Sequence, residues 1–239
     1  MNEYINHHPK SNKRNLLFHD WQKRSGKFNR ELGAFLSKDL NAKIIELGCS
    51  TGQVIAWLHS LGFSNASGID IDKSAIKQGL KSGVKNIEQC DLLFFLQNYQ
   101  HADVDLFILR DVAEHFSKDQ LENVMSLMIQ KLKIGGKIFI KTLNAQSPVA
   151  NFMLHGDWTH QILFTKDSLA QLANMSGQLI VRTIIGDPIK RFSKREILLK
   201  IVFLIYRATY KKFMGLLIGE SGKDMIFEPN LICVFEKVK

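Results

Sequence analysis

This chain of 239 residues, 45% of them hydrophobic, is long enough for one α/β domain with a sizeable core and too short for two ordinary domains with a linker. Its cysteines, Cys49, Cys90 and Cys233, are widely spaced and form no C-x-x-C pair, which argues against a disulfide framework or a zinc site and favours a reducing compartment. The N-terminus lacks an apolar signal segment and no run of about 18 apolar residues occurs, so we expect a cytoplasmic protein.

The net charge of +9 is concentrated at the two ends of the chain. Residues 1–30 carry seven Lys and Arg against two acids, and residues 187–239 carry eleven against six. Residues 31–186, by contrast, carry 14 against 15. A partner of the basic surface should therefore contact the terminal regions.

The first part of the chain predicts a helical arm followed by alternating strands and helices. The arm occupies residues 1–42 and includes the helical stretch FNRELGAFLSKDL. The predicted strands that follow are AKIIEL, SGIDI, VKNIEQC, VDLFIL and GKIFIKT, and the predicted helices lie near 51–61, 73–81, 92–99 and 117–132. Strands alternating with helices at this spacing predict a mostly parallel sheet with helices on both faces.

The last part of the chain predicts two further strands. A loop, LNAQSPVANFMLHGDWTHQILF, precedes a capped helix, TKDSLAQLANMSG, and then come the strands QLIVRTIIG and NLICVFEKV. These late strands suggest antiparallel pairing at one edge of a seven-stranded sheet. Residues 187–226 form a basic, apolar helical insertion before the last strand, and we expect one domain over residues 1–239.

The turn after the first strand, IIELGCSTGQ, has two interpretations. Its letters match the G-x-S-x-G elbow that presents the serine nucleophile of α/β-hydrolases. Only a helical arm precedes this strand, so Ser50 lacks the earlier loop that supplies oxyanion donors. The dinucleotide fingerprint G-x-G-x-x-G also fails, because Ser50 and Gln53 occupy two of its glycine positions. What remains is a glycine turn, E-x-G-x-x-x-G, that lets a nucleotide-like ligand lie against the backbone.

Acidic residues end the next two predicted strands. Asp70 stands 22 residues after Gly48, where a carboxylate can accept hydrogen bonds from both ribose hydroxyls. Asp91 ends the third strand, where it can accept from an adenine amino group. An acid at such a position is often only a helix N-cap, as we expect for Asp72 before KSAIKQG. Three features in order at the carboxyl ends of strands nevertheless favour a ligand site.

Together, IIELGCSTGQ, GIDID, CDLL and LRDVAEH resemble class I S-adenosylmethionine-dependent methyltransferases over about residues 26–186. The resemblance implies a Rossmann-like methyltransferase sheet and S-adenosyl-L-methionine as the cofactor, with its methionine part at the glycine loop, its ribose at Asp70 and its adenine at Asp91. This chain departs from the family's common G-x-G-x-G at Ser50, a change that the site should tolerate. The cofactor-binding residues that the resemblance implies are Glu46, Gly48, Ser50, Gly52, Asp70, Ile71, Asp91, Leu92 and Arg110.

Candidates for acceptor chemistry follow the fourth and fifth strands. His115 ends LRDVAEH and is either a base or a structural residue that opens the next helix. The segment HGDWTHQILFT supplies His155, Asp157 and His160, and the spacing D-x-x-H lets a carboxylate orient an imidazole. We expect His160 to be the general base with Asp157 as its orienter, the alternative being loop stabilisation. We expect no metal, because these residues offer at most three ligands and no cysteine is nearby.

The insertion contains REILLKIVFLIYRATYKKFMGLLIG, in which Lys200, Arg207 and Lys211 form a cationic stripe beside a wide apolar face. Such a helix suits peripheral contact with an anionic membrane, and it is equally compatible with packing on its own domain or on a dimer partner. The oligomeric state stays open.

The segments LRDVAEHF, NAQSP, GDWTH and FTKDSL, with the insertion, are similar to bacterial methyltransferases associated with cell-surface polysaccharide synthesis. This similarity implies a sugar hydroxyl on a lipid-linked glycan or a nucleotide-sugar as the acceptor. The alternatives are a quinone or other small-molecule O-methyltransferase and a cofactor-binding scaffold without catalysis. A nucleic-acid acceptor is disfavoured, because the chain has neither an N/D-P-P-Y motif after the fourth strand nor a recognised RNA-binding module.

Overall fold

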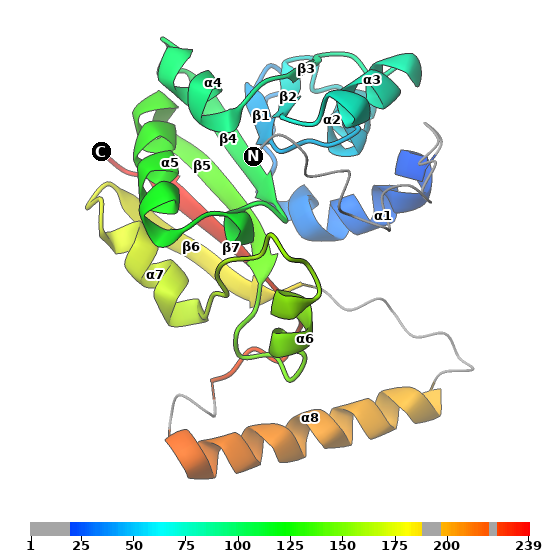
Figure 1. The fold of residues 1–239 in the computed structure, drawn as a ribbon, viewed down its shortest axis with the longest axis vertical. Coiled ribbons are helices and arrows are strands. Elements are labelled where there is room, and N and C mark those ends of the chain that lie inside the picture. The colour runs from blue at the N-terminus through cyan, green and yellow to red at the C-terminus, as the bar shows by residue number, and fades with distance from the viewer. Residues whose placement is uncertain (1–19, 188–196, 220–223) are drawn as a thin grey trace.

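The computed structural model describes residues 20–187, 197–219 and 224–239. A seven-stranded sheet forms its centre, in the order β3-β2-β1-β4-β5-β7-β6 (Figure 1). The strands are β1 (Ile44–Leu47), β2 (Ala66–Asp70), β3 (Ile87–Gln89), β4 (Val104–Arg110), β5 (Leu132–Leu143), β6 (Leu179–Gly186) and β7 (Asn230–Lys237).

Strands β1 to β5 are parallel, and β7 runs antiparallel to both of its neighbours, β5 and β6. The prediction of a mostly parallel α/β sheet with antiparallel pairing at one edge is therefore confirmed. The antiparallel strand is β7, which lies one place in from the edge because β6 pairs outside it. The cofactor and acceptor loops both follow parallel strands, so they meet at the carboxyl edge of the sheet.

Helices cover both faces of this sheet (Figure 1). One face carries α1 (Asp20–Leu32), α2 (Gln53–Ser60) and α3 (Lys73–Lys81), and the other carries α4 (Leu92–Asn98), α5 (Lys118–Lys131) and α7 (Lys166–Asn174). Side chains of β4 alternate between the two cores: Phe107 and Leu109 pack on the α5 side, and Leu106 and Ile108 on the α2 side. Burial on both faces explains why this strand is a continuous apolar run.

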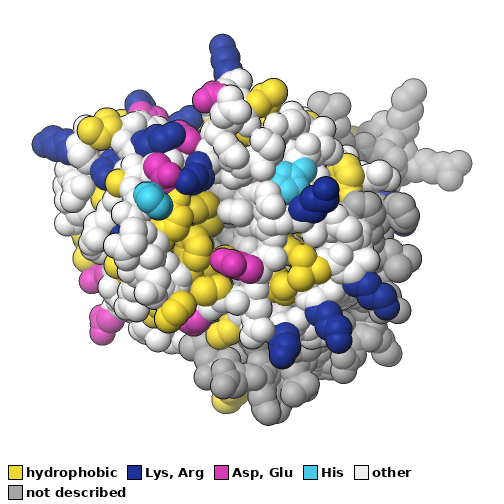
Figure 2. All heavy atoms as spheres, turned by 90° about the horizontal axis from the view of Figure 1, so that it is seen from above, with side chains coloured by type: hydrophobic (Ala, Val, Ile, Leu, Met, Phe, Trp, Pro, Cys, Tyr) yellow, Lys and Arg dark blue, Asp and Glu magenta, His cyan; other side chains and the backbone are white. Residues whose placement is uncertain are grey.

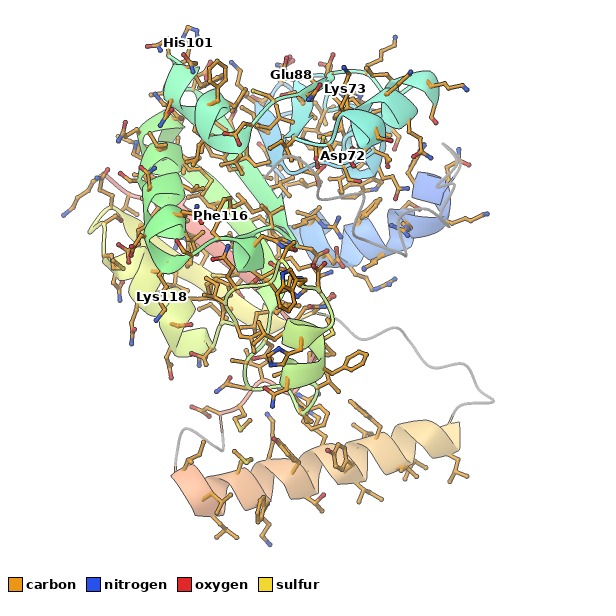
Figure 3. The ribbon with its side chains drawn as sticks, viewed as in Figure 1. Asp72, Lys73, Glu88, His101, Phe116 and Lys118 are labelled. Carbon is orange, nitrogen blue, oxygen red and sulfur yellow. The ribbon has the colours of Figure 1, made fainter. Side chains whose placement is uncertain are left out.

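Side-chain caps start the helices where the sequence predicted them. The Asp72 carboxylate accepts hydrogen bonds from the backbone N–H groups of Ser74 and Ala75, which confirms it as the N-cap of α3 (Figure 3). Ser117 and Gln120 form a reciprocal capping box at the start of α5. Each cap satisfies backbone donors that the first helical turn leaves without partners.

Besides the 3-10 turn η2 (Gly33–Phe35) that follows α1, three helical segments lie outside this regular pattern. A short helix, α6 (Ala150–His155), lies in the segment that the sequence predicted as a loop, and a 3-10 turn, η3 (Ala113–His115), follows β4. Helix α8 (Ile197–Ile218) lies in the predicted insertion, and none of the described helices combines the length and hydropathy needed to cross a bilayer. The parts of the predicted arm and insertion at 1–19, 188–196 and 220–223 lie outside the described residues.

Candidate active site

The glycine loop after β1 is held tightly against β2 and η3. The backbone N–H groups of Gly48 and Cys49 both donate to the Ile69 carbonyl, at 2.8 and 2.9 Å. Gly48 has φ 81°, and a Cβ atom there would stand 2.5 Å from Cγ2 of Val112, the residue before η3. Only glycine therefore lets the cofactor loop and the acceptor-side turn approach this closely.

Ser50, where the family pattern has glycine, also adopts the left-handed conformation, with φ 50°. Its backbone N–H donates to Oδ2 of Asp70 at 2.6 Å, and Oδ1 of Asp70 accepts from the N–H of Asp72 at 2.8 Å. Burial raises the pKa of Asp70, and these two hydrogen bonds oppose that shift. A carboxylate has about four lone-pair sites, so Asp70 can hold the loop and still accept from ribose hydroxyls.

The adenine-side candidates flank the starts of α3 and α4. Asp91 is the N-cap of α4, since its Oδ1 accepts from the N–H of Phe94 at 2.9 Å. Its second carboxylate oxygen is not used by that cap. Ile71 follows β2 with an exposed side chain, and Leu92 is the first residue of α4. The structure thus brings an acceptor atom and two apolar side chains to one end of neighbouring strands.

Three buried polar atoms near the glycine loop have no hydrogen-bond partner within the described part of the chain: Oε2 of Glu46, Nε2 of Gln53 and Nε of Arg110. Burial raises the pKa of Glu46 to about 8, and the nearby charge of Arg110 opposes the rise. A carboxylate and two N–H donors are the groups that an amino acid's ammonium and carboxylate need. They fit the methionine end of S-adenosylmethionine.

Helix α1 completes this side of the site through contacts that the sequence analysis missed. Arg24 donates from Nη1 to Oε1 of Gln53 at 3.2 Å, and Glu31 accepts from Nη2 of Arg110 at 2.8 Å. Lys141, 3% exposed on β5, lies 3.5 Å from Glu31. Lys141 also lies 3.4 Å from Asp187, so this network ties α1 to the ends of β4, β5 and β6.

On the acceptor side, the segment after α6 is docked on η3. The carbonyl of Glu114 accepts from the N–H groups of Gln161 and Ile162, at 2.8 and 3.3 Å. The Gln161 side chain donates to the His115 carbonyl at 2.7 Å. The Glu114 carboxyl accepts from the Thr142 hydroxyl at 2.9 Å, and burial raises its pKa to about 7. These contacts bring His115 and His160 together from separate loops.

The rings of His115 and His160 lie with centroids 4.8 Å apart. Nδ1 of His160 lies 2.9 Å from the Met153 carbonyl, and its Nε2 lies 4.0 Å from Oδ2 of Asp157. Asp157 is therefore close to His160, as the D-x-x-H spacing predicted. Oδ1 of Asp157 accepts hydrogen bonds from the backbone N–H and the hydroxyl of Thr159, at 3.0 and 2.7 Å. His155, the other histidine of this segment, ends α6.

Thr159 joins Asp157 to His115, a link that sequence analysis did not identify. Its Oγ1 lies 2.9 Å from Nδ1 of His115. A carboxylate only accepts, so the single hydroxyl proton of Thr159 goes to Asp157. Nδ1 of His115 must then be the donor to Thr159, which makes Nε2 the basic nitrogen of the neutral ring. Burial and the neighbouring His160 lower the pKa of His115.

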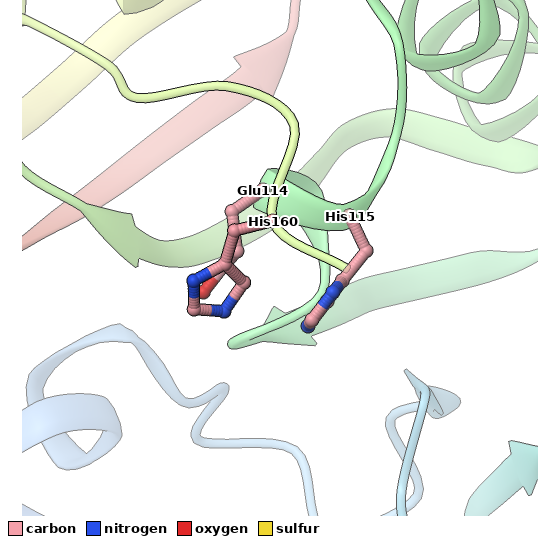
Figure 4. Close-up of side chains that lie close together, drawn as sticks. All are labelled: Glu114, His115 and His160. Carbon is pink, nitrogen blue, oxygen red and sulfur yellow. The ribbon is translucent and has the colours of Figure 1, made fainter. Parts of the chain in front are cut away.

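Glu114, His115 and His160 form a compact cluster, shown in Figure 4, whose ligand-type atoms all lie within 4.8 Å of one another. This trio differs from the histidines that the sequence analysis considered for a metal. Zinc–nitrogen bonds of 2.0–2.1 Å in tetrahedral geometry would place such atoms roughly 3.3 Å apart. The cluster as it stands is looser than a zinc site, and its imidazole Nδ1 atoms are already used in hydrogen bonds.

The strand order, the glycine loop and the acids that follow β2 and β3 together define the fold and cofactor site of a class I methyltransferase. A family model described as a methyltransferase domain matches residues 20–181, and the chain belongs to this family. It is a methyltransferase, and its cofactor is S-adenosyl-L-methionine. The buried polar atoms of Glu46, Gln53 and Arg110 fit that cofactor.

Individual relatives are distant. The ubiquinone biosynthesis O-methyltransferase of Idiomarina loihiensis is 23% identical over an alignment of 171 residues, and the match covers 64% of this chain and 69% of that protein. The ribosomal protein L11 methyltransferase of Shewanella baltica is 28% identical over 103 residues, 43% of this chain and 34% of that one, so the match spans about a third of its length. A solved SAM-dependent methyltransferase from Archaeoglobus fulgidus shares the fold, with a TM-score of 0.65 and 17% identity. The match covers 91% of this chain and 94% of that protein.

Proposed function

We propose that this methyltransferase transfers the methyl group to a hydroxyl oxygen, with His115 as the general base and His160 beside it. The hydrogen-bonded chain from Asp157 through Thr159 to His115 carries this proposal. An alcohol attacks a sulfonium poorly unless its proton leaves during the attack, and a positioned base contributes roughly 10² to 10⁴-fold. Acceptors that are already nucleophilic, such as amines and thiolates, do not require this hydrogen-bonded relay for their methylation.

The proton balance of the reaction follows from these side chains. The bound cofactor supplies a methyl group on a positively charged sulfur. Nε2 of His115 takes the acceptor's proton as the acceptor oxygen forms its bond to carbon, and the bond from carbon to sulfur breaks with its electron pair on sulfur. Asp157, through Thr159, stabilises the imidazolium that results. The pKa of His115 lies below its usual value, so the ring is neutral and ready at pH 7.

Different residues of the protein bind different parts of the cofactor. The glycine loop, Glu46 and Arg110 hold the methionine part of the cofactor. Oε2 of Glu46 can accept from the ammonium group, and Nε of Arg110 can donate to the carboxylate. Holding the reacting atoms in line is the main task of such a site, since orientation alone reaches effective molarities of about 10⁵ to 10⁸ M in ideal cases. The other residues that we assign to the cofactor are Gly48, Ser50, Gly52, Asp70, Ile71, Asp91 and Leu92.

For the acceptor, we propose a sugar hydroxyl on a lipid-linked glycan or a nucleotide-sugar. Trp158 is 99% exposed and lies next to Asp157 in sequence, and Phe152 of α6 is 76% exposed. Solvent-exposed aromatic side chains near the base offer flat apolar surfaces on which a sugar ring can stack. The excess of basic residues at both ends of the chain suits a phosphate-bearing acceptor.

A phenolic quinone precursor is the second candidate. It is favoured by the match to a ubiquinone biosynthesis O-methyltransferase, which spans 69% of that protein. Both acceptors present a neutral hydroxyl group, so both require the base. They differ in the group that the exposed aromatics would contact, a sugar ring in one case and a planar aromatic ring in the other.

Labelled methyl transfer from S-adenosylmethionine into separate lipid-linked glycan, nucleotide-sugar, quinone-precursor and RNA fractions tests this assignment. We expect label in a glycan or nucleotide-sugar fraction, and none when His115→Gln replaces the wild type. Label only in the quinone precursor would establish the second candidate. Label in RNA, or no label in any fraction from a protein that binds the cofactor, would refute the proposal.

A further inference from the structure

Helix α8 has a fixed inner face that packs on the segment before β7. The rings of Phe203, Tyr206 and Tyr210 meet the buried ring of Phe227 edge-on, at centroid distances of 5.5, 5.5 and 5.7 Å. On the same side Nη1 of Arg207 binds Oε1 of Glu228 at 2.8 Å. These contacts set the rotation of the helix about its axis, so they decide which residues face outward.

The outer face of α8 is apolar. At 3.6 residues per turn, Ile201, Ile205 and Leu216 fall on the side opposite Phe203 and Tyr210. Exposed large hydrophobic side chains run along the whole helix, and apolar side chains gathered on one surface mark an interaction site. Apart from Tyr206, they are Leu198, Ile201, Val202, Leu204, Ile205, Phe213, Leu216, Leu217 and Ile218.

All charged side chains of α8 are positive. Its 22 residues include four Lys and Arg and no acid. Arg207, one residue of the predicted cationic stripe, is paired with Glu228 towards the domain, and the side chain of Lys200 lies outside the described part. Lys212 lies among the outward apolar residues and Lys211 at their border. The face of the molecule away from α8 has acidic and basic side chains intermixed (Figure 2).

We propose that the outer face of α8 binds the surface of an anionic bilayer. An apolar face with lysines inside and beside it is the composition of a helix that lies in the interface, its apolar side chains among the acyl chains and its ammonium groups reaching lipid phosphates. A second copy of this chain fits less well. Its α8 would bring the same unbalanced lysines into the contact, and like charges destabilise an apolar interface.

The helix lies on the membrane rather than across it, because no described helix has the length and hydropathy to span one. Helix α8 lies beyond the carboxyl edge of the sheet, on the same side of the molecule as α6 (Figure 1). Docking through α8 therefore places the acceptor side of the site next to the lipid surface. The docking itself does not depend on which acceptor is methylated.

Co-sedimentation of the full chain with vesicles tests the proposal. Vesicles of phosphatidylcholine mixed with phosphatidylglycerol should bind the protein, and vesicles of phosphatidylcholine alone should bind it much more weakly. Each basic residue near an anionic surface is worth about 1 kcal/mol, so changing both Lys211 and Lys212 to Gln should lower the affinity roughly 30-fold. Added salt should weaken binding in the same direction.

Two matched variants separate this face from general hydrophobicity. Ile205→Glu changes an outward residue of α8 that is 59% exposed, and Ile134→Glu changes an isoleucine near the start of β5 that is still more exposed, at 75%. We expect the first to abolish vesicle binding and the second to leave it unchanged, with cofactor affinity preserved in both. Equal binding of the two lipid mixtures, or full binding by Ile205→Glu, would overturn the proposal. So would a wild-type dimer that Ile205→Glu dissociates and that binds no vesicles.

Discussion

Thr159 places its hydroxyl oxygen 2.9 Å from Nδ1 of His115, and this contact determines which ring nitrogen is basic. The hydroxyl proton belongs to Asp157, so the imidazole must donate from Nδ1 and keep its lone pair on Nε2. A short polar side chain between a carboxylate and an imidazole thus does the orienting that the spacing of Asp157 and His160 suggested for a direct pair.

Removing that hydroxyl tests the link. Thr159→Val keeps the shape and loses one hydrogen bond to His115, worth about 0.5 to 1.5 kcal/mol, so kcat should fall about 3- to 10-fold with cofactor affinity unchanged. The contact that raises the pKa of His115 is with the backbone of Thr159, which the substitution keeps, so the acid limb of the pH profile should stay in place. Thr159→Ser retains the hydroxyl and should behave as wild type. A Val variant with the wild-type rate would remove the Thr159 hydroxyl from the mechanism.

Cofactor binding should depend strongly on Asp70 and weakly on the Ser50 side chain. Losing a buried carboxylate that accepts hydrogen bonds costs about 1.5 to 3 kcal/mol, so Asp70→Ala should raise the Kd for S-adenosylmethionine by about 10- to 150-fold. Calorimetry measures this directly, and a thermal melt shows whether the variant still folds without the bond to Ser50. Ser50→Ala should leave affinity and rate nearly unchanged. Unaltered affinity in Asp70→Ala would take Asp70 out of the site.

Glu46 should make cofactor affinity depend on pH. Its pKa of about 8 means that the carboxyl is protonated at neutral pH in the cofactor-free protein. Binding an ammonium group favours the ionised form, so below pH 8 the proton must leave on binding, at about 1.4 kcal/mol per pH unit. The wild-type affinity divided by that of Glu46→Gln should therefore rise with pH up to about 8 and then level off. Titration of the cofactor's own amino group affects both proteins equally and cancels in this ratio. A ratio that does not change with pH would contradict the assignment of Glu46 to the ammonium group.

Methyl transfer should not require a divalent metal. The cluster of Glu114, His115 and His160 has the side-chain types that bind metals, but we assign its imidazoles to proton transfer and its carboxyl to Thr142. Treatment with EDTA should leave the rate unchanged. Loss of activity that one divalent cation restores would turn this cluster into a metal centre and refute the base mechanism.

Much of the fold could be predicted because it depends on local pattern. Buried parallel strands leave apolar runs such as VDLFIL, and side-chain caps such as Asp72 mark helix starts. Helix α6 escaped prediction because its N-cap, Val149, makes no side-chain hydrogen bond and leaves no signal in the sequence.

The parts of the site that could not be predicted depend on tertiary contacts. Glu31 and Arg110 are 79 residues apart in the chain, and no local pattern reports their ion pair. Helical periodicity in the insertion gives an apolar face and a basic stripe, but only tertiary contacts show which side faces the domain. These contacts are the pairing of Arg207 with Glu228 and the packing of Phe203 on Phe227. Thr159 was unremarkable in sequence because its role depends on a histidine 44 residues away.

The turnover of His115→Gln, measured in the labelled methyl-transfer assay beside His160→Gln, tests the central claim most directly. The account predicts that His115→Gln lowers kcat about 10² to 10⁴-fold while the Kd for S-adenosylmethionine stays within about a factor of two. The wild-type rate should rise with pH, with a midpoint below the usual histidine pKa, and then level off, because the pKa of His115 is lowered. Full turnover in His115→Gln together with its loss in His160→Gln would move the base to His160. Full turnover in both variants would contradict a histidine-assisted transfer to a hydroxyl group.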